Sequence, residues 1–395
     1  MIDTIVIKIW YPDFRVLNEN LFNRPLVIKD GLISQDPREE VKRAEKYTYN
    51  PTKTDKILHG YLPNLTAYER FFQDNGRTYE LHIKFSIPKL LFQWSIKEVG
   101  NEDFEQVIKL IKLKLQRIGI ETTENAIRKA IVSSAHFCKN MELAKPKTVL
   151  DAIRQLHKAE LGKGKKKKWR DFDGDGQALY FHTTYANIII YDKIQEVLGP
   201  QSKGDDKEDR IETERQILRS LDKDQLPEIL RLEARFGKQV SLDAFLSKVL
   251  GRRVNGITFE ELFDVETSKK VLLKIWNDIM DRPTNQLALK MEQSIDEIFD
   301  TMLLGTTPED RRRPHSLNKL LINVLLLALI NKSGAGVLRK KVEKGWDEKT
   351  WKRLLKKIGE SSTLFKSVPD NQMIADIQIA LDKFEKYDWK PDVDI

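Results

Sequence analysis

The chain has 395 residues, with 68 lysines and arginines against 60 aspartates and glutamates, so its formal net charge is +8. Hydrophobic residues make up 40% and charged residues 32%, a balance that excludes both a disordered chain and a membrane-embedded one. The longest apolar run, 320–330, is too short to span a bilayer. A single cysteine, Cys138, excludes an internal disulfide, and we expect a cytoplasmic protein. The basic excess favours a polyanionic partner without proving one.

The first 260 residues predict strands mixed with helices. Alternating apolar and polar residues, or short apolar runs, predict strands at 2–10, 78–87, about 126–139, 177–183, 186–191 and 228–236. Helical spacing of apolar residues predicts helices at 103–117, 147–160 and about 207–220. Residues 11–76 are punctuated by prolines and predict short extended pieces. The order suggests two similar halves, each with a hairpin, a long helix and a return strand, although no residue-level repeat supports this.

From about residue 265 helical periodicity dominates. The predicted helices are 267–282, 286–303, 315–331, 347–358 and 371–385. The fold class is therefore α+β: a mostly antiparallel sheet with packed helices, followed by an all-helical C-terminal region. We place the domains at 1–262 and 263–395. The lysine-rich face of the helix at 347–358 fits a helix lying against phosphates, and it fits a solvated helix face equally well.

Three predicted strands each carry one side chain able to bind a metal at their centre. They are His82, His136 and Glu233. Imidazole and carboxylate groups together can bind a divalent ion, and two histidines tilt the choice from Mg²⁺ toward Mn²⁺. Each histidine taken singly is more often a hydrogen-bonded strand residue than a ligand. Glu233 lies between Arg231 and Arg235 on one strand face and could be only a salt-bridged residue.

The segment from Asn187 to Glu196 leads a β run into a tyrosine followed closely by a lysine. A tyrosine can attack a phosphodiester and retain the broken strand as a covalent ester. Tyr191 is the first candidate, with Lys193 as its activating cation and Glu196 to orient that lysine. Tyr191 could instead be a residue at the edge of the core. Tyr180 and Tyr185 are rival nucleophiles, and His182 is a rival ligand.

A basic segment, 162–170, separates two predicted elements and predicts a mobile loop. We expect its four consecutive lysines, together with Lys84, Arg231 and Arg235, to contact phosphates. The lysines are Lys165, Lys166, Lys167 and Lys168. The acidic segment that follows, 171–176, resembles part of a calcium loop, but it lacks the last glutamate ligand and the flanking helices. It is interpreted as an acidic turn.

At these residues the chain resembles the filamentous-phage gene II type replication proteins, also found on plasmids and distantly related to His-hydrophobe-His nickases and relaxases. The resemblance rests on 1–3 leading into a strand, 81–90, the pattern Tyr191-Asp192-Lys193-x-x-Glu196, 230–235 and a helical region at 345–359. It covers most of the chain at low identity. An intact His-hydrophobe-His motif is absent, and His82 and His136 stand where relatives carry acidic residues.

The resemblance implies a metal-dependent DNA nickase and strand transferase that initiates rolling-circle replication through a 5′-phosphotyrosine at Tyr191. It implies roles for Lys193 as motif lysine and for Glu233 as motif glutamate, with Mg²⁺ or Mn²⁺ as cofactor. Expected partners are single- and double-stranded origin DNA, with a host helicase and polymerase. The C-terminal helices would bind duplex DNA or pair subunits. The alternatives are a mobilisation relaxase and a non-catalytic origin- or operator-binding protein; an RNA-binding protein is a weaker one.

Overall fold

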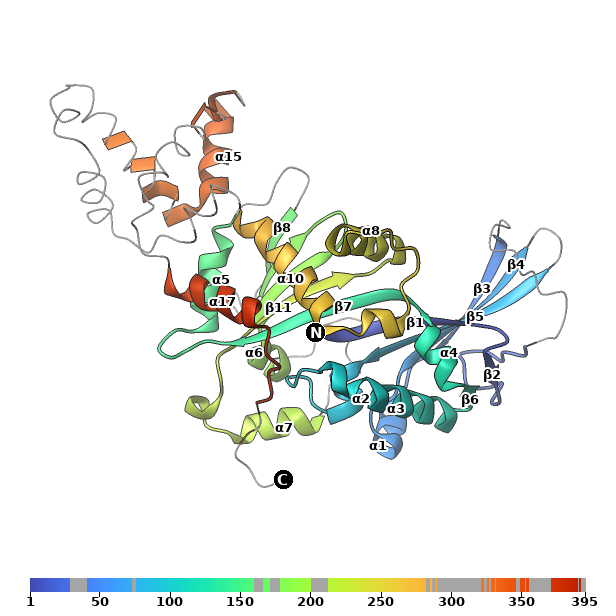
Figure 1. The fold of residues 1–395 in the computed structure, drawn as a ribbon. Coiled ribbons are helices and arrows are strands. Elements are labelled where there is room, and N and C mark those ends of the chain that lie inside the picture. The colour runs from blue at the N-terminus through green and yellow to red at the C-terminus, as the bar shows by residue number, and fades with distance from the viewer. Residues whose placement is uncertain are drawn as a thin grey trace.

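A computed structural model gives the fold (Figure 1). The structure describes residues 1–28, 41–72, 76–159, 166–170, 178–199, 212–281, 371–389 and 391, with parts of the stretch from 285 to 354. Within these residues nine strands form one sheet and two short strands form another. The large sheet contains β1 (Ile2–Trp10), β3 (Val41–Tyr49), β4 (Asn64–Phe72), β5 (Arg77–Ser86), β7 (Ile131–Glu142), β8 (Lys166–Arg170), β9 (Ala178–His182), β10 (Asn187–Asp192) and β11 (Ile229–Phe236). The small one pairs β2 (Phe14–Val16) with β6 (Ile120–Thr122).

The helices lie between and after these strands. They are α1 (Lys53–His59), α2 (Ile87–Phe92), α3 (Phe104–Arg117), α4 (Glu124–Lys129), α5 (Val149–His157), α6 (Lys193–Leu198), α7 (Glu212–Ser220), α8 (Gln239–Leu250), α9 (Phe259–Leu262), α10 (Val265–Met280), α15 (Ala335–Gly345) and α17 (Gln372–Lys383). Two single 3-10 turns cover Asn101–Asp103 and Lys223–Gln225. The α+β class with an antiparallel sheet is thus confirmed.

The strand order is β3-β4-β5-β1-β7-β11-β10-β9-β8, and every pairing is antiparallel. A three-strand meander stands at each end, β3-β4-β5 and β8-β9-β10. Each meander joins the centre through a strand distant in sequence, β5 through β1 and β10 through β11. The predicted similarity of two halves, each with a hairpin, a long helix and a return strand, stays a prediction.

One face of the sheet is apolar and carries the core. On β1 the side chains of Ile5, Ile7 and Ile9 are at most 2% exposed, because residues two apart on a strand share a face. Helix α3 covers this face with Val107, Ile108, Ile111 and Leu115, spaced three and four residues apart. Side chains of α5, α8 and α10 belong to the same cluster of buried residues. The helices therefore lie mainly on the apolar side of the sheet.

The last described helices pack onto the sheet as well. Helix α10 begins at the N-cap Asp264, whose carboxylate accepts from Glu266 N and Thr267 N, and it packs against β7 and β11. Helix α17 packs against α10 and β7. The boundary between 262 and 263 stays a prediction, but two helices that follow it share the core of the sheet.

Three sequence predictions are corrected by the fold. Residues 126–129 lie in α4, and the strand that we expected from 126 begins at Ile131. Residues 166–168, expected in a mobile loop, form part of the edge strand β8 paired with β9. Two nine-residue strands, β3 and β4, lie in the segment expected to hold only short extended pieces.

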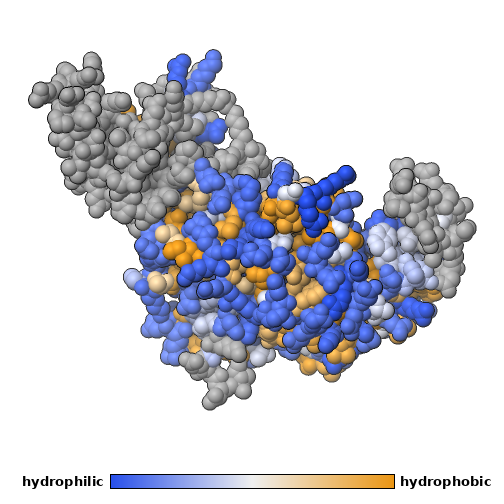
Figure 2. All heavy atoms as spheres, in the orientation of Figure 1, coloured by the Kyte–Doolittle hydropathy of each residue, from blue (hydrophilic) through white to orange (hydrophobic). Residues whose placement is uncertain are grey.

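The described surface in the orientation of Figure 2 is mostly hydrophilic, with smaller hydrophobic patches between the charged side chains. Among the described residues there is no helix of the length and hydrophobicity that a membrane span requires.

Candidate functional site

The second face of the sheet is polar. Antiparallel partners share a face, so the register places Lys8 beside His82, Arg235 beside His136, and Asn187 beside both Arg235 and His182. Helices α6 and α7 cover one end of this face, where Ile229 packs with Ile194 and Leu218. Away from that end most of the cationic and histidine side chains are half-buried, while the carboxylates of Glu80 and Glu233 beneath them are buried. The candidate site lies on this face.

Glu233 is the centre of one cluster of side chains from three neighbouring strands. Arg235, on the same strand β11, donates from Nε to Glu233 Oε1 at 2.8 Å and from Nη2 to Oε2 at 3.2 Å. His136 Nδ1 on β7 lies 3.3 Å from Oε1. The hydroxyl of Tyr191 on β10 donates to Oε2 at 3.0 Å. These four residues were all singled out from the sequence, and the fold brings them together.

The electrostatics of this cluster follow from burial and from one arginine. Glu233 is 1% exposed, and burial alone would raise the pKa of its carboxyl group. The guanidinium of Arg235 and the bond to His136 more than offset this, and they hold that pKa well below its usual value. Burial, and then the Glu233 charge, raise the pKa of the Tyr191 hydroxyl well above 10. As the cluster stands, Tyr191 is a neutral phenol that donates a hydrogen bond.

His82 belongs to a different cluster. Its ring nitrogen Nε2 contacts the Glu80 carboxylate, which also accepts from Arg70 Nε at 2.7 Å and lies 3.8 Å from Lys8 Nζ. Strands β5 and β7 are two spacings apart, and His82 stands level with Ile131, so His82 and His136 are roughly 19 Å apart by strand geometry. The sequence left open whether His82, His136 and Glu233 converge, and in the structure His82 lies apart from the other two, so the three cannot hold one ion together as they are placed here.

The side chains around Glu233, in the arrangement that the structure gives, do not fit a bound divalent ion. Among the described residues no three His, Cys, Asp or Glu side chains gather in a way that could hold a metal. Both oxygens of Glu233 are engaged by a guanidinium, a positive group where a cation would have to sit. The requirement for Mg²⁺ or Mn²⁺ stays a prediction.

Lys193 begins α6 rather than extending β10, so it leaves the strand geometry that would place it beside Tyr191. Its ammonium group is buried and pairs with Glu196 at 2.6 Å, the partner expected from the sequence. The expectation that Glu196 orients Lys193 agrees with this contact. A direct role of Lys193 at the Tyr191 hydroxyl stays a prediction.

The expected phosphate contacts have different outcomes. Arg231 is 1% exposed and donates to Asn140 Oδ1 at 2.6 Å and to the Ser95 carbonyl at 2.8 Å, so it is a structural residue and not a phosphate ligand. Arg235 has a 36% exposed side chain on the polar face. Lys84 is half-buried on the same face. Lys165 lies outside the described residues, and Lys166, Lys167 and Lys168 belong to β8.

The two rival nucleophiles, Tyr180 and Tyr185, come from β9 and from the turn between β9 and β10, the strand that carries Tyr191. Tyr180 is half-buried on the polar face and stacks on His182 at 6.3 Å between ring centroids. Tyr185 occupies the β9–β10 turn, 39% exposed, and its hydroxyl accepts a hydrogen bond from Lys248 at 2.9 Å. It borders a cavity of about 210 Å³ formed with α8 and α10. Tyr180 interacts electrostatically with Arg235 and so borders the Glu233 cluster, whereas Tyr185 lies against Phe245 of α8.

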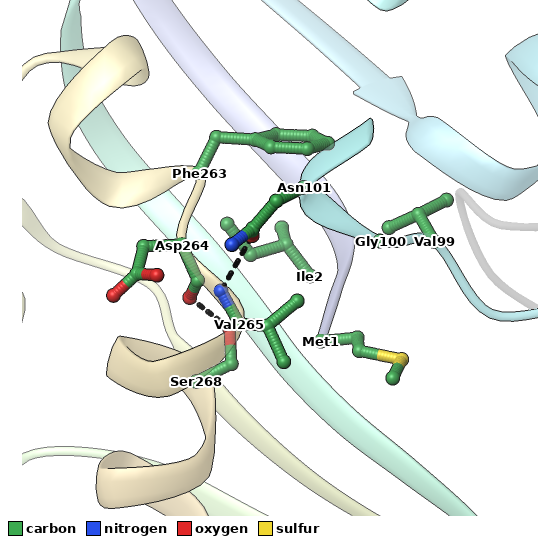
Figure 3. Close-up of a pocket in the computed structure, with 9 residues that line it drawn as sticks. All are labelled: Met1, Ile2, Val99, Gly100, Asn101, Phe263, Asp264, Val265 and Ser268. Atoms are coloured by element: carbon green, nitrogen blue, oxygen red, sulfur yellow. Dashed lines mark hydrogen bonds between the residues drawn. The ribbon is translucent and has the colours of Figure 1, made fainter. Parts of the chain in front are cut away.

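A small pocket at the start of α10 is structural (Figure 3). Asn101 Oδ1 accepts from Val265 N at 2.9 Å, and Ser268 Oγ donates to the Asp264 carbonyl at 3.2 Å. The volume of about 10 Å³ holds about one water molecule. Met1, Ile2 and Phe263 line the pocket with apolar side chains. The pocket therefore lies at the packing contact between the start of α10 and the sheet.

Sequence reasoning missed the members of the Glu80 cluster that come from β4. The signal was present: Asn64, Thr66, Tyr68 and Arg70 alternate with Leu65 and Ala67, which is the pattern of a half-buried strand. The surrounding prolines concealed it. Trp10 and Lys8 of β1 were likewise not singled out.

Comparison with known proteins adds no relative: neither a family model, nor a curated protein, nor a solved structure matches the chain.

Proposed function

We propose that the protein is a rolling-circle replication initiator that nicks one DNA strand with Tyr191 and later rejoins it. The observation that carries the proposal is the Glu233 cluster. Tyr191, His136 and Arg235 come from segments up to about a hundred positions apart in the sequence, and all three contact one buried carboxylate. A phenol, a base, an imidazole and a guanidinium are the groups that a phosphoryl transfer to tyrosine uses.

The proposed step forms a bond between the Tyr191 oxygen and the phosphorus, and it breaks the bond from phosphorus to the 3′ oxygen. The phenol proton passes to Glu233 Oε2, its present hydrogen-bond partner. The leaving 3′ oxygen takes a proton from solvent or from His136. Arg235 stabilises the charge that builds on the phosphate oxygens. The products are a 5′-phosphotyrosine and a free 3′ hydroxyl, which a polymerase extends while a helicase opens the duplex.

The pairing of Arg235 determines how readily Glu233 accepts the Tyr191 proton. While it pairs with Glu233, the carboxylate is a weak base for a phenol with a raised pKa. The exposed part of Arg235 faces the side from which DNA would approach, and a phosphate competes for its two N–H donors. Transfer of Arg235 to the phosphate would raise the pKa of Glu233 and make it a better acceptor for the Tyr191 proton.

A second candidate is a non-catalytic DNA-binding protein. It is favoured by the 5% exposure of Tyr191 and by the complete engagement of Glu233, which together make a closed structural network. This candidate predicts DNA binding that Tyr191→Phe leaves unchanged, without any covalent product.

The test is a nicking assay on supercoiled and single-stranded DNA carrying fragments of the replicon that encodes the chain. Wild type is compared with Tyr191→Phe, with Tyr180→Phe and Tyr185→Phe as matched controls, in Mg²⁺, in Mn²⁺ and in chelator. We expect a protein–DNA adduct on a denaturing gel that Tyr191→Phe reduces by about a thousandfold or more. The controls keep it. An adduct that persists in Tyr191→Phe, or none from any of the proteins, contradicts the proposal.

A further inference from the structure

The polar face carries a second group of side chains on the other half of the sheet, on β3, β4, β5 and β1. One row across these strands contains Lys46, Tyr68, Glu80 and Trp10. The next row contains Thr48, Thr66, His82 and Lys8. These rows combine aromatic rings with cations, on a face whose opposite side is the packed core.

The aromatic rings of this group are held in place and remain accessible. Trp10 is 41% exposed, although large apolar side chains of a sheet are usually covered. The Arg70 guanidinium lies 5.9 Å from the centroid of the Trp10 ring and 5.7 Å from that of Tyr68. Tyr68 packs edge-on against His82 at 5.0 Å. The buried Glu80 holds Arg70 in place, because its Oε2 lies 2.7 Å from Arg70 Nε and 2.6 Å from Arg70 Nη2.

The charge of this group is positive. Lys8, Lys46, Arg70 and Lys84 share the face with the carboxylate of Glu80, so four cations against one anion leave +3 with His82 neutral. Lys46 is exposed, and the others are half-buried. Cations beside an exposed aromatic ring complement a strand whose phosphates are negative and whose bases are unpaired.

We propose that Trp10, Tyr68 and Arg70 form a subsite for single-stranded DNA, on which one or two bases stack while Lys8 and Lys46 contact phosphates. A duplex hides its base faces inside the stack, so the ring arrangement selects an unpaired strand. The inference rests on the proposed function for the identity of its occupant. It adds a site separate from the Tyr191 cluster, since Glu80 and Glu233 are roughly 34 Å apart by strand spacing and rise.

This separation gives the subsite a role in the reaction. Stacked nucleotides advance about 3.4 Å each along one strand, so the two clusters are bridged by roughly ten nucleotides. A strand held at Trp10 is thereby kept on the sheet while its far end lies at Tyr191. The subsite would retain the DNA after cleavage, when only one of the two ends is covalently attached.

The experiment is a fluorescence-anisotropy titration of a labelled 20-nucleotide single strand with the full chain carrying Tyr191→Phe, which separates binding from nicking. Trp10→Ala should weaken binding by about fivefold or more, since one stacked base contributes at least that factor. Trp10→Phe keeps a ring and should stay within about threefold of the parent. Lys46→Ala should lower the slope of affinity against salt by roughly 0.7.

Two control variants change similar side chains on the helix-covered side. Ile57→Ala removes a 74% exposed apolar side chain from α1, and Lys109→Ala removes an exposed lysine from α3. Both should bind as the parent does. Equal weakening by Trp10→Ala and Ile57→Ala, or an unchanged affinity of Trp10→Ala, overturns the subsite.

The occupant and the parent proposal are tested separately. A duplex of the same sequence should bind without dependence on Trp10. Tighter, Trp10-dependent binding of the equivalent RNA would replace DNA with RNA as the occupant and overturn the inference as stated. If the protein with Tyr191 intact does not nick DNA but the binding of single-stranded DNA still depends on Trp10, the proposed nickase function is wrong and the subsite is supported.

Discussion

Two arginines that are four residues apart on β11 have opposite surroundings. Arg231 is enclosed: it donates hydrogen bonds to Asn140 Oδ1 and to the Ser95 carbonyl, and Asp3 lies 3.9 Å away. Arg235 reaches the open face and pairs with Glu233. The alternation of a strand places both on one side, and only the covering by α6, α7 and the 94–98 segment separates their roles.

Arg231→Met is therefore expected to lower the free energy of unfolding by about 3–5 kcal/mol, because it leaves buried polar partners without a donor. Urea unfolding measures this, and Arg231→Lys should lose less. Arg235→Met serves as the matched variant: its stability should change less, while nicking falls. Near-native stability of Arg231→Met together with lost DNA binding would return Arg231 to the role of phosphate ligand.

At the scale of single residues the sequence was informative where it offered a reactive side chain within a strong strand. Tyr191, Glu233, Arg235 and His136 were singled out that way, and they meet. His82 was singled out by the same reasoning and does not join them, because register and strand order are set by pairings between distant segments. A pattern within one strand carries no information about which strand lies beside it.

At the scale of elements, Asp192, the N-cap of α6, is subject to two opposite effects on the pKa of its carboxyl group. Asp192 Oδ1 accepts from Gln195 N at 2.9 Å, which caps the helix. Burial, the larger effect, raises the pKa of the Asp192 carboxyl to about 6. In the unfolded chain the group ionises near 3.9, so the folded state binds more protons between about pH 4 and 6 and its stability falls as pH rises through that window.

Asp192→Asn should remove this dependence. Asparagine caps as well as aspartate and carries no charge to desolvate, so at pH 8 the variant should be more stable by on the order of 2 kcal/mol. At pH 4 the two proteins should unfold at similar urea concentrations. A stability difference of the same size at both pH values would show that capping, and not ionisation, separates the two proteins.

Element type and position were predictable for β1, β5, α3, β10 and β11, whose periodicity is strong over their whole length. The boundary of β7 was not, because Glu124–Lys129 has Thr123 as a side-chain N-cap that turns the segment into a short helix before the strand begins. The lysines of β8 gave no strand signal either. Their extended form comes from pairing with β9, a tertiary effect that outweighs local propensity.

At the scale of the whole molecule, residues 384–389, here called the return strap, tie the last described helix to the first half of the chain. Tyr387 O accepts from Glu98 N at 3.0 Å, and Tyr387 N donates to Glu98 Oε2 at 2.9 Å. Lys139 Nζ donates to the Glu385 carbonyl at 2.8 Å and to Glu98 Oε2 at 2.7 Å. The strap thereby closes over the buried pair of Glu98 and Lys139, between α17 and β7.

No pattern in the sequence predicted this closure. The strap is short, irregular and rich in charge, and its hydrogen-bond partners lie between 245 and 289 positions away in the sequence. The sequence predicts a separate helical region at 263–395 because helical periodicity dominates from about residue 265. The contacts of α10, α17 and the strap with the sheet make the described part of that region contribute to the stability of the sheet itself.

A chain ending at Lys383 should consequently unfold more easily than one ending at Trp389, although both lack the residues after the strap. Removal of the strap abolishes six hydrogen bonds to residues 98–142. Four are those of Tyr387 N, Tyr387 O, Tyr387 OH and Glu385 O, and two are donated by Lys386 Nζ to Glu102 and Asp103. Removal also opens the Glu98–Lys139 pair to water. At about 1 kcal/mol for each of the first four bonds, with little added by the more exposed pairs of Lys386, the loss is roughly 4 kcal/mol, and it should appear in the transition of the whole sheet. Circular dichroism during thermal unfolding measures it. If the shorter chain shows an unchanged main transition and loses only a small separate one, the strap belongs to an independently folding C-terminal unit, and residues 263–395 form the autonomous domain that the sequence suggested.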